Sequence, residues 1–272
     1  MAAFPVKYIN NAMRGAPVLN GQAGTLIGVL DAFLLTGFGT VSALSVTVAG
    51  GIATAAVQAG NSFDKSCIVW VDGATPAALN GEQRVLTASS TAITFFTTAP
   101  DGPATGTITI KVAPVGGWEK KYSGTNKAVY RSTDPQSSGF CLRVDDVGSY
   151  RARVRGFEAM SDVDSGTGPF PTDAQIDGGG YWFKSMASSV AAVRYDLIAD
   201  SRTIFLAVGA RSHDDPSATA SPLRGFGDIS DAQGYYWPRG LEVGLWYYPV
   251  AIDLTGTHEC DAAGPVQAAK AP

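Results

Sequence analysis

Residues 40–114 consist of short runs in which apolar and polar side chains alternate, separated by turns rich in glycine, asparagine and proline. In the first pair, the apolar residues of 44–48 alternate with Ser45 and Thr47, Gly50 and Gly51 supply a two-residue turn, and 52–57 runs back. A period of two with such a turn predicts a β-hairpin. Almost no charge interrupts the series, so we expect a compact all-β module without catalytic chemistry.

The same kind of pattern continues along the chain. Further strand-like runs in the module are 67–71, 84–88, 92–96 and 107–112. Beyond it they are 118–122, 127–131, 140–144, 150–157, 181–183, 195–199, 203–208 and 241–248. The pattern predicts a mainly β protein, with a small β-sandwich module and a larger β-rich body.

One segment has helical spacing. The apolar residues of 26–34 recur at intervals of one, three and four inside residues 21–39, and Gly37 and Gly39 end the pattern. This predicts one short N-terminal helix that packs on a sheet or on a neighbouring subunit. Residues 4–19 resemble an extended arm with a short strand at 6–9, which either docks on its own domain or reaches a partner.

Turn-rich segments suggest the domain boundaries. Ala113–Gly117 is the clearest linker signal, and we divide the chain into an arm with helix (1–39, packing with the body), the β module (40–114), the body (115–260) and a flexible tail (261–272). Long loops are expected at 161–180 and 211–221. The module then reads as an insertion that projects from the body.

Composition limits the function classes. Only 16% of the 272 residues are charged, the formal net charge is −4, and Lys and Arg are scattered. A nucleic-acid binder normally carries a basic face, so none is expected. The longest apolar run, 26–35, contains Asp31 and is too short to span a bilayer, and the first residues show no secretory signal. We therefore expect a protein made in the cytoplasm, without membrane insertion.

Candidate chemistry is sparse. His213 and His258 are the only histidines, and a triad from the adjacent Ser212, His213 and Asp214 is improbable because triads converge from separate segments. The acids are more numerous, and nothing selects a catalytic pair among Asp145, Asp146, Glu158, Asp162, Asp164, Asp228 and Asp231. We expect these acids to be solvated loop residues.

Two short motifs imitate ion or phosphate sites. Asp162, Asp164 and Gly166 start like a calcium loop, but the twelfth position is Asp173 instead of glutamate. The glycine-rich 225–228 has no predicted helix after it and reads as a tight turn. Cys67, Cys141 and Cys260 have no metal-ligand spacing, and buried reduced thiols are preferred over a disulfide. No metal or cofactor is expected.

Clusters of aromatic residues offer contact surfaces. Such rings serve the core, a subunit interface or a glycan site. The candidate interface or glycan-contact residues, together with the apolar face of the predicted helix, are Leu26, Leu30, Phe33, Trp182, Tyr235, Tyr236 and Trp237.

Three stretches carry a resemblance to a known family. They are "VKYINNAMRGAPVLNGQAGTLIGVLDAFLLTGFG", the module from "VAGGIATAAVQAGNSFDKSCIVWVDGATPAALNGEQRVLTASS" to "ATGTITIKVAP", and "GWEKKYSGTNKAVYRS" with "ARVRGFEAMSDVDSGTGPFP". To about Asp228 the chain resembles poorly characterised virion structural proteins of tailed bacteriophages. The module is similar to immunoglobulin-like domains inserted in phage surface proteins.

The resemblance implies a non-enzymatic structural protein located in the virion and assembled with copies of itself and other virion proteins. A tail, neck or baseplate component is the first expectation. A head decoration or cementing protein is the alternative, and an adhesion protein that contacts host-surface glycan is another. The resemblance transfers no catalytic or binding residue.

Overall fold

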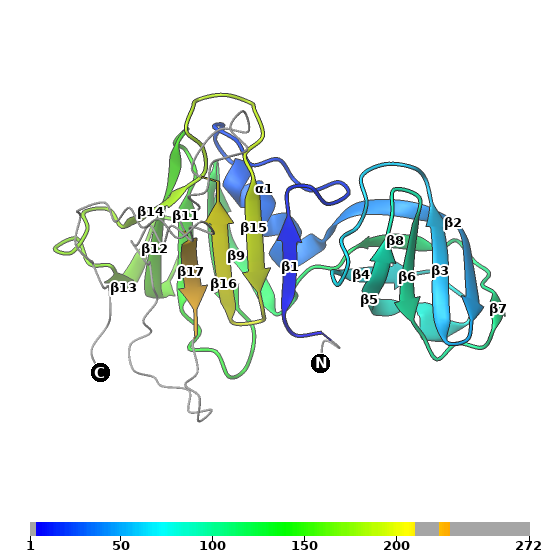
Figure 1. The fold of residues 1–272 in the computed structure, drawn as a ribbon. Coiled ribbons are helices and arrows are strands. Elements are labelled where there is room, and N and C mark those ends of the chain that lie inside the picture. The colour runs from blue at the N-terminus through cyan, green and yellow to red at the C-terminus, as the bar shows by residue number, and fades with distance from the viewer. Residues whose placement is uncertain (1–3, 210–222, 229–272) are drawn as a thin grey trace, which may run out of the picture.

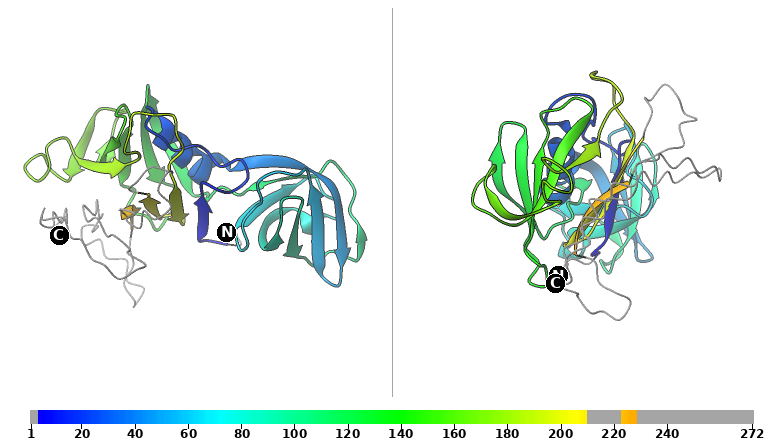
Figure 2. Two further views of the ribbon diagram at one scale, coloured as in Figure 1. Left: turned by 45° about the horizontal axis from the view of Figure 1, so that its top comes forward. Right: turned by 90° about the vertical axis from the view of Figure 1, so that its left-hand side faces the viewer.

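The computed structural model describes residues 4–209 and 223–228, and it is mainly β with one short α-helix, as the sequence predicts. Figure 1 shows two parts, a barrel formed by residues 38–112 and a larger body formed by the rest. Figure 2 shows the barrel set to one side of the body. Of the predicted elements, the strand at 241–248, the loop 211–221 and the tail 261–272 lie outside the described residues.

The barrel is a seven-stranded sheet in the order β3-β6-β5-β4-β8-β2-β7, and it closes because β2 also pairs with β3. Its elements are β2 (Phe38–Ala49), β3 (Ile52–Val57), β4 (Ile68–Asp72), the 3₁₀ turn η2 (Ala77–Leu79), β5 (Gly81–Ala88), β6 (Ala92–Phe96), β7 (Gly102–Pro103) and β8 (Thr109–Val112). All the strand pairings are antiparallel.

Two strands, β2 and β5, bend and so belong to both layers of the barrel. The register of β2 shifts between Ala43 and Ser45 where it pairs with β3, and that of β5 shifts between Val85 and Thr87. Such irregularities bend a strand, so each of these strands borders both layers. The expected sandwich is therefore two layers joined through shared strands. The predicted hairpin turn is also present, since Gly50 and Gly51 have φ of 58° and 76°, which this turn requires.

The body has two sheets. One has the order β13-β12-β11-β10-β9, with β14 also pairing β12, and the other has the order β1-β15-β16-β17. The first contains β9 (Trp118–Gly124), β10 (Lys127–Ser132), β11 (Cys141–Asp145), β12 (Arg151–Met160), β13 (Gly166–Phe170) and β14 (Gly180–Phe183). The second contains β1 (Lys7–Asn10), β15 (Tyr195–Ala199), β16 (Thr203–Val208) and β17 (Leu223–Gly227).

The predicted helix is α1 (Thr25–Asp31), continued by the π-helical turn η1 (Ala32–Thr36). The apolar residues of α1 are buried in the main core, and Tyr130 of β10 donates a hydrogen bond to Asp31 at the end of the helix. The helix therefore packs against the sheets of its own chain and not on a neighbouring subunit.

Two expectations about irregular structure are wrong. The predicted long loop at 161–180 contains β13, and the predicted tight turn at 225–228 includes the end of β17. A Cβ on Gly225 of β17 would lie only 2.8 Å from the ring of Phe205 in the neighbouring strand β16. The large Phe205 side chain thus covers the backbone of Gly225, and this packing explains a glycine within a strand. The alternation pattern of the sequence does not reveal it.

The chain enters and leaves the barrel at adjacent points. Phe38 is the register partner of Val112, and after the barrel the N–H groups of Val115 and Gly116 donate to the carbonyls of Phe33 and Leu34 at 2.7 and 3.2 Å. Both connections are therefore fastened to η1. This arrangement is that of an inserted unit.

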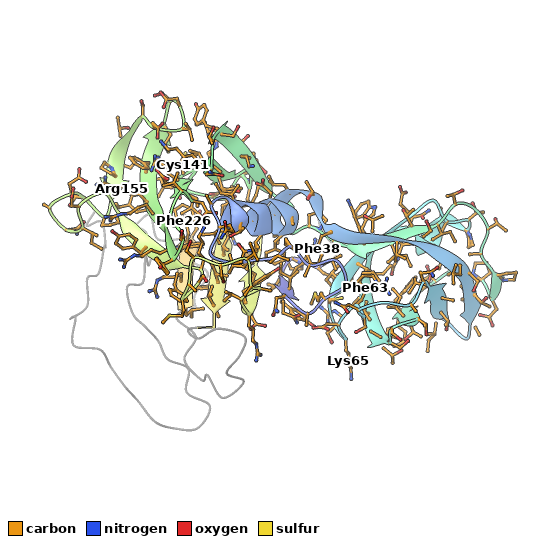
Figure 3. All side chains as sticks on the ribbon, turned by 90° about the horizontal axis from the view of Figure 1, so that it is seen from above. Phe38, Phe63, Lys65, Cys141, Arg155 and Phe226 are labelled. Atoms are coloured by element: carbon orange, nitrogen blue, oxygen red, sulfur yellow. The ribbon has the colours of Figure 1, made fainter. Side chains whose placement is uncertain are left out.

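The N-terminal arm docks on its own chain and joins the two parts. Strand β1 pairs with β15 in the body, while its buried Lys7 Nζ donates to Glu82 Oε1 of the barrel and to Pro114 O, both at 2.5 Å, and to Val115 O at 3.1 Å. The expected projecting module is thus held by a clamp. Phe63 lies close to this boundary in Figure 3, whereas Lys65 points away from the chain.

A second contact lies at the crossing of the arm and β2. Arg14 donates to Gln58 O at 2.7 Å and to Ser90 O at 3.0 Å, and its guanidinium lies 5.7 Å from the centre of the Phe63 ring. A Cβ on Gly15 would lie 2.5 Å from Gly39 Cα, so the two backbones cross too closely for any side chain there. The barrel is therefore oriented by the arm as well as by its own two connections.

Candidate interaction surfaces

A fully buried ion pair forms the base of one end of the body. Lys184 follows β14, Asp146 follows β11, and both side chains are 0% exposed while Lys184 Nζ pairs with Asp146 Oδ1. The other carboxylate oxygen accepts the N–H groups of Leu26 and Ile27 at 2.8 and 3.3 Å, and Lys184 also donates to Gln22 O at 2.6 Å. The carboxylate therefore caps α1, which has no cap from its own first residues.

This pair changes the interpretation of Asp146. The sequence predicts a solvated acid, but burial raises its pKa, while Lys184 and the two helix N–H groups oppose the rise. A buried charge is tolerated only when it is paired and hydrogen-bonded. Asp146 and Lys184 lie 38 positions apart in the sequence. The spacing of nearby residues therefore does not predict that these two side chains form an ion pair.

Three loops cover this base, and we call residues 16–24, 147–150 and 185–193 the apical loop cluster. The N–H groups of Lys184 and Ser185 both donate to Tyr150 O, at 3.0 and 3.2 Å. Gly21 N donates to Ser189 O at 3.0 Å, and Asn20 Nδ2 donates to Val190 O at 3.2 Å. The loops therefore hold one another in place, and the one between β14 and β15 rises at the top of Figure 1.

The apical loop cluster exposes apolar side chains and contains no charged residue. Its exposed members, with the exposed fraction of each, are Val18 (52%), Val147 (60%), Tyr150 (52%), Met186 (56%) and Val190 (76%). Grouped exposed apolar side chains on a supported backbone are typical of protein–protein contact surfaces. The cluster is the candidate assembly surface.

The barrel has a different surface. An open hollow of about 330 Å³ is lined by Gly51, Ala78, Gln83, Phe96, Thr97 and Thr98. Phe96 is 66% exposed, and its cross-strand partner Ile52 is 38% exposed. We call this hollow the barrel groove. It combines an accessible aromatic ring with amide and hydroxyl groups.

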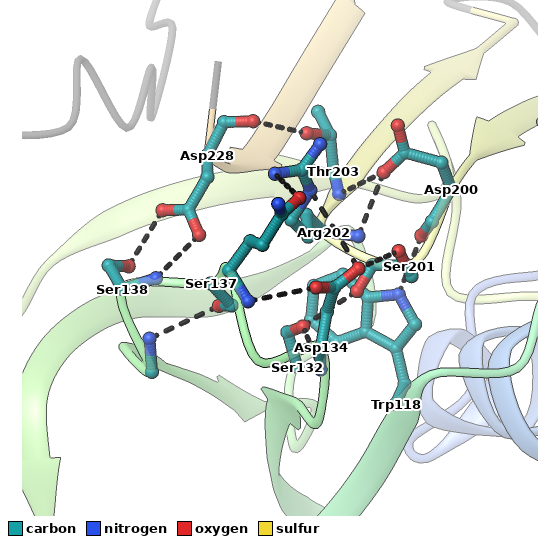
Figure 4. A network of polar contacts seen from close by, with 12 residues as sticks. Trp118, Ser132, Asp134, Ser137, Ser138, Asp200, Ser201, Arg202, Thr203 and Asp228 are labelled. Carbon is teal, nitrogen blue, oxygen red and sulfur yellow. Dashed lines mark hydrogen bonds and ion pairs between the residues drawn. The ribbon is translucent and has the colours of Figure 1, made fainter. Parts of the chain in front are cut away.

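A polar network fastens the two sheets of the body together (Figure 4). Ser201, in the turn between β15 and β16, donates to Asp134 Oδ2 at 2.6 Å, and Trp118 Nε1 donates to Asp200 O at 2.8 Å. Asp228 accepts the N–H and the hydroxyl of Ser138, both at 2.7 Å. The hollow beside this network measures about 10 Å³, so it is a structural junction with room for about one water molecule.

The structure corrects the predicted contact residues. Leu26, Leu30, Phe33 and Trp182 are all 0% exposed, so none of them offers a surface to a glycan or a partner. The helix stripe faces the core of its own chain, and the alternation of β14 points Trp182 inward. Tyr235, Tyr236 and Trp237 lie outside the described residues.

The acids of the body serve structure. Asp164 pairs with Lys127 and Arg143 at 2.8 and 2.6 Å, and these two partners lower its pKa. Asp162 accepts the N–H groups of Asp164 and Ser165, which closes the turn that imitates a calcium loop. Within residues 4–209 and 223–228, no cluster of His, Cys, Asp and Glu is suited to a metal ion. Asp231 and the two histidines lie outside these ranges.

The described cysteines are Cys67 and Cys141, and both are buried free thiols, as expected. Burial raises the pKa of Cys67 to about 12 and also raises the pKa of Cys141. Cys260 lies outside the described residues. In the same part of the chain, no helix is long and apolar enough to cross a membrane.

Scans against protein families, against characterised proteins and against solved structures found no match to this chain.

Proposed function

We propose that this chain is a non-enzymatic structural protein of a tailed bacteriophage virion, and that it assembles with other virion proteins through the apical loop cluster. The observation that carries the proposal is the combination of five exposed apolar side chains with uncharged loops fixed over a buried ion pair. A prearranged surface loses little conformational entropy when a partner binds. The sequence resemblance supplies the virion context.

A tail, neck or baseplate component is the proposed position, with head decoration as the alternative. The clamp through Lys7 supports an assembly role, because it holds the barrel at one orientation relative to the loop cluster. A component of a regular assembly has to present its surfaces in one fixed arrangement.

The test is incorporation into particles. Met186→Asp together with Val190→Asp places two charges in the apical loop cluster, and we expect strongly reduced amounts of the protein in purified virions by quantitative mass spectrometry. Leu44→Asp on the barrel, where Leu44 is 69% exposed, is the matched control and is expected to incorporate normally. Normal incorporation of the double variant would overturn the assigned surface.

Position in the particle is tested separately. Head-only assemblies and complete particles are compared by immunolabelling. A tail component is absent from the heads, whereas a decoration protein labels their surface.

Adhesion to the host surface is the second candidate function. The barrel groove favours it, because Phe96 is an exposed aromatic residue beside polar groups on a part of the chain away from the loop cluster. Trp182, on which the sequence-based adhesion hypothesis partly rested, is buried. Binding of the purified protein to host envelope material, lost in Phe96→Ala, tests this function.

A further inference from the structure

The barrel groove offers hydrogen-bonding groups with spare capacity. Gln83 donates through Nε2 to Leu79 O at 3.2 Å, which leaves its side-chain oxygen as a free acceptor. Thr97 Oγ1 accepts the N–H of Ala99 at 3.1 Å, so its hydroxyl proton remains available. Thr98 is exposed beside them. The groove therefore presents an acceptor and hydroxyl groups next to the Phe96 ring.

The backbone around these groups is fixed. Thr97 N donates to Gly51 O at 3.0 Å, which joins the end of β6 to the β2–β3 turn. Gln83 is anchored by its bond to η2, the turn that also contributes Ala78. Gly51 has no side chain and Ala78 has only a methyl group, so the hollow between the β2–β3 turn and η2 stays open. A ligand meets groups that are already positioned.

The groove is uncharged. None of its six lining residues is ionisable, and the neighbouring charges on β5 are directed to the arm, where Glu82 binds Lys7 and the Arg84 guanidinium lies 4.9 Å from the Phe4 ring centre. Beside the groove, the Asp101 carboxylate accepts the N–H of Gly50 at 2.9 Å and so fastens the β2–β3 turn. The lining residues themselves offer a charged ligand no ion pair. The electrostatics instead fit a neutral ligand that has both an apolar face and hydroxyl groups.

We propose that the barrel groove binds a neutral hexopyranose unit of a surface polysaccharide, an inference that rests on the adhesion function named above. The C–H face of the sugar stacks on Phe96, while its hydroxyls replace water at Gln83, Thr97 and Thr98. Exchanging water for sugar hydroxyls is nearly neutral in energy, so the aromatic contact provides most of the affinity. A single site of this kind is weak.

Multiple copies compensate for weak individual sites. Linked binding units raise the overall affinity by factors of about 10² to 10⁴ without any new contact. A particle that carries several copies of the barrel at a fixed orientation would therefore adhere firmly to a repetitive polysaccharide. This is why the clamp at Lys7 is relevant to the groove.

The test uses the full-length purified protein with neutral probes, namely glucose, galactose, mannose and their oligosaccharides. Saturation-transfer NMR is expected to show contact with the C–H face of at least one of them. Phe96→Ala is expected to weaken binding about tenfold or more, and Ala78→Glu, which fills the hollow, to abolish it. Trp70→Ala is the matched control, since Trp70 is an exposed aromatic of the same barrel outside the groove.

The outcomes separate this inference from the proposed functions. No transfer from any neutral saccharide, or unchanged binding by Phe96→Ala, overturns the groove assignment. If Phe96→Ala instead abolishes self-association seen by analytical ultracentrifugation, the groove is a contact between copies and the inference also fails. Binding of whole host envelopes that survives Phe96→Ala leaves adhesion standing through another site, and incorporation into virions reports on the assembly function alone.

Discussion

The barrel and the body are built on different principles. Each of the buried polar or charged residues in the described chain lies outside residues 38–112, namely Lys7, Asn20, Ser132, Asp146, Lys184, Ser185 and Arg224. The barrel interior is therefore apolar throughout, whereas the body includes a buried ion pair, a helix cap and a polar junction between its sheets. Apolar burial depends mainly on local alternation, while a buried ion pair depends on two residues meeting in space.

This difference agrees with the two proposed roles. In the barrel, antiparallel strands around an apolar interior leave the barrel groove on the surface. In the body, polar anchors fix three irregular loops, which gives the apical loop cluster a defined shape. We therefore expect changes in polar anchors to affect the body far more than the barrel.

The largest expected effect is on the buried ion pair. Lys184→Met leaves Asp146 charged and unpaired in the core, so we expect the free energy of unfolding to fall by about 3–5 kcal/mol. Chemical denaturation followed by circular dichroism measures it. Arg194→Met is the control, because the side chain of Arg194 is 79% exposed and exposed ion pairs contribute about 0–1 kcal/mol. Equal effects of the two variants would contradict a special role for the pair.

A smaller effect is expected at the clamp between the two parts. Lys7→Met leaves Glu82 and two carbonyl groups without their shared donor, which we expect to cost about 1–3 kcal/mol. It should also uncouple the barrel from the body. Pulsed thiol labelling reads each part separately, since Cys67 lies in the barrel and Cys141 in the body.

In the native protein we expect both thiols to become reactive at the same denaturant concentration, and in Lys7→Met at different ones. Lys65→Met is the control, because Lys65 is exposed and its side chain points away from the chain. Separate transitions already present in the native protein would show that the clamp does not couple the two parts.

Acid is expected to weaken the body through its surface carboxylates. The hydrogen bond from Ser201, followed by the N–H of Gln136, lowers the pKa of Asp134 below its ordinary value of 3.8. Its contribution to stability is therefore complete above that value and is lost as the pH falls through the lowered pKa. Burial raises the pKa values of Asp146 and Asp196, which act in the opposite direction.

The comparison of native protein with Asp134→Asn isolates this contribution. Unfolding curves at pH 5 and pH 3 are expected to show a smaller loss of stability for the variant. An identical loss would mean that Asp134 has no part in the acid response.

The smallest effect is expected on the thiols themselves. Because burial raises the pKa values of Cys67 and Cys141, both should resist a thiol reagent at about pH 8 without denaturant. Peptide mapping by mass spectrometry identifies the labelled positions. Rapid labelling of Cys67 alone would show that the barrel opens independently of the body.

Much of the fold was accessible from the pattern. The runs 92–96, 195–199 and 203–208 coincide with β6, β15 and β16, and the glycine pair forms the expected turn. Strands β13 and β17 were not predicted, because glycine, and in β13 also proline, interrupts the alternation of apolar and polar residues in these short segments. Both strands form by pairing with a neighbouring strand, β12 and β16 respectively. The candidate surfaces were harder to predict, since Trp182 resembles an exposed aromatic until its side of β14 is known.

The sequence by itself determined the mainly β class, the position of the helix and the hairpins of the barrel, because these depend on residues close together in the chain. Only the tertiary structure decided that the sheet closes, that Lys7 clamps the barrel to the body, and that Lys184 meets Asp146. These features depend on strand pairing and on charged side chains that lie tens of residues apart in the sequence and meet only in the folded chain. Such contacts form only when folding brings their partners together, and the pattern of apolar and polar residues along the chain does not show which distant residues will meet.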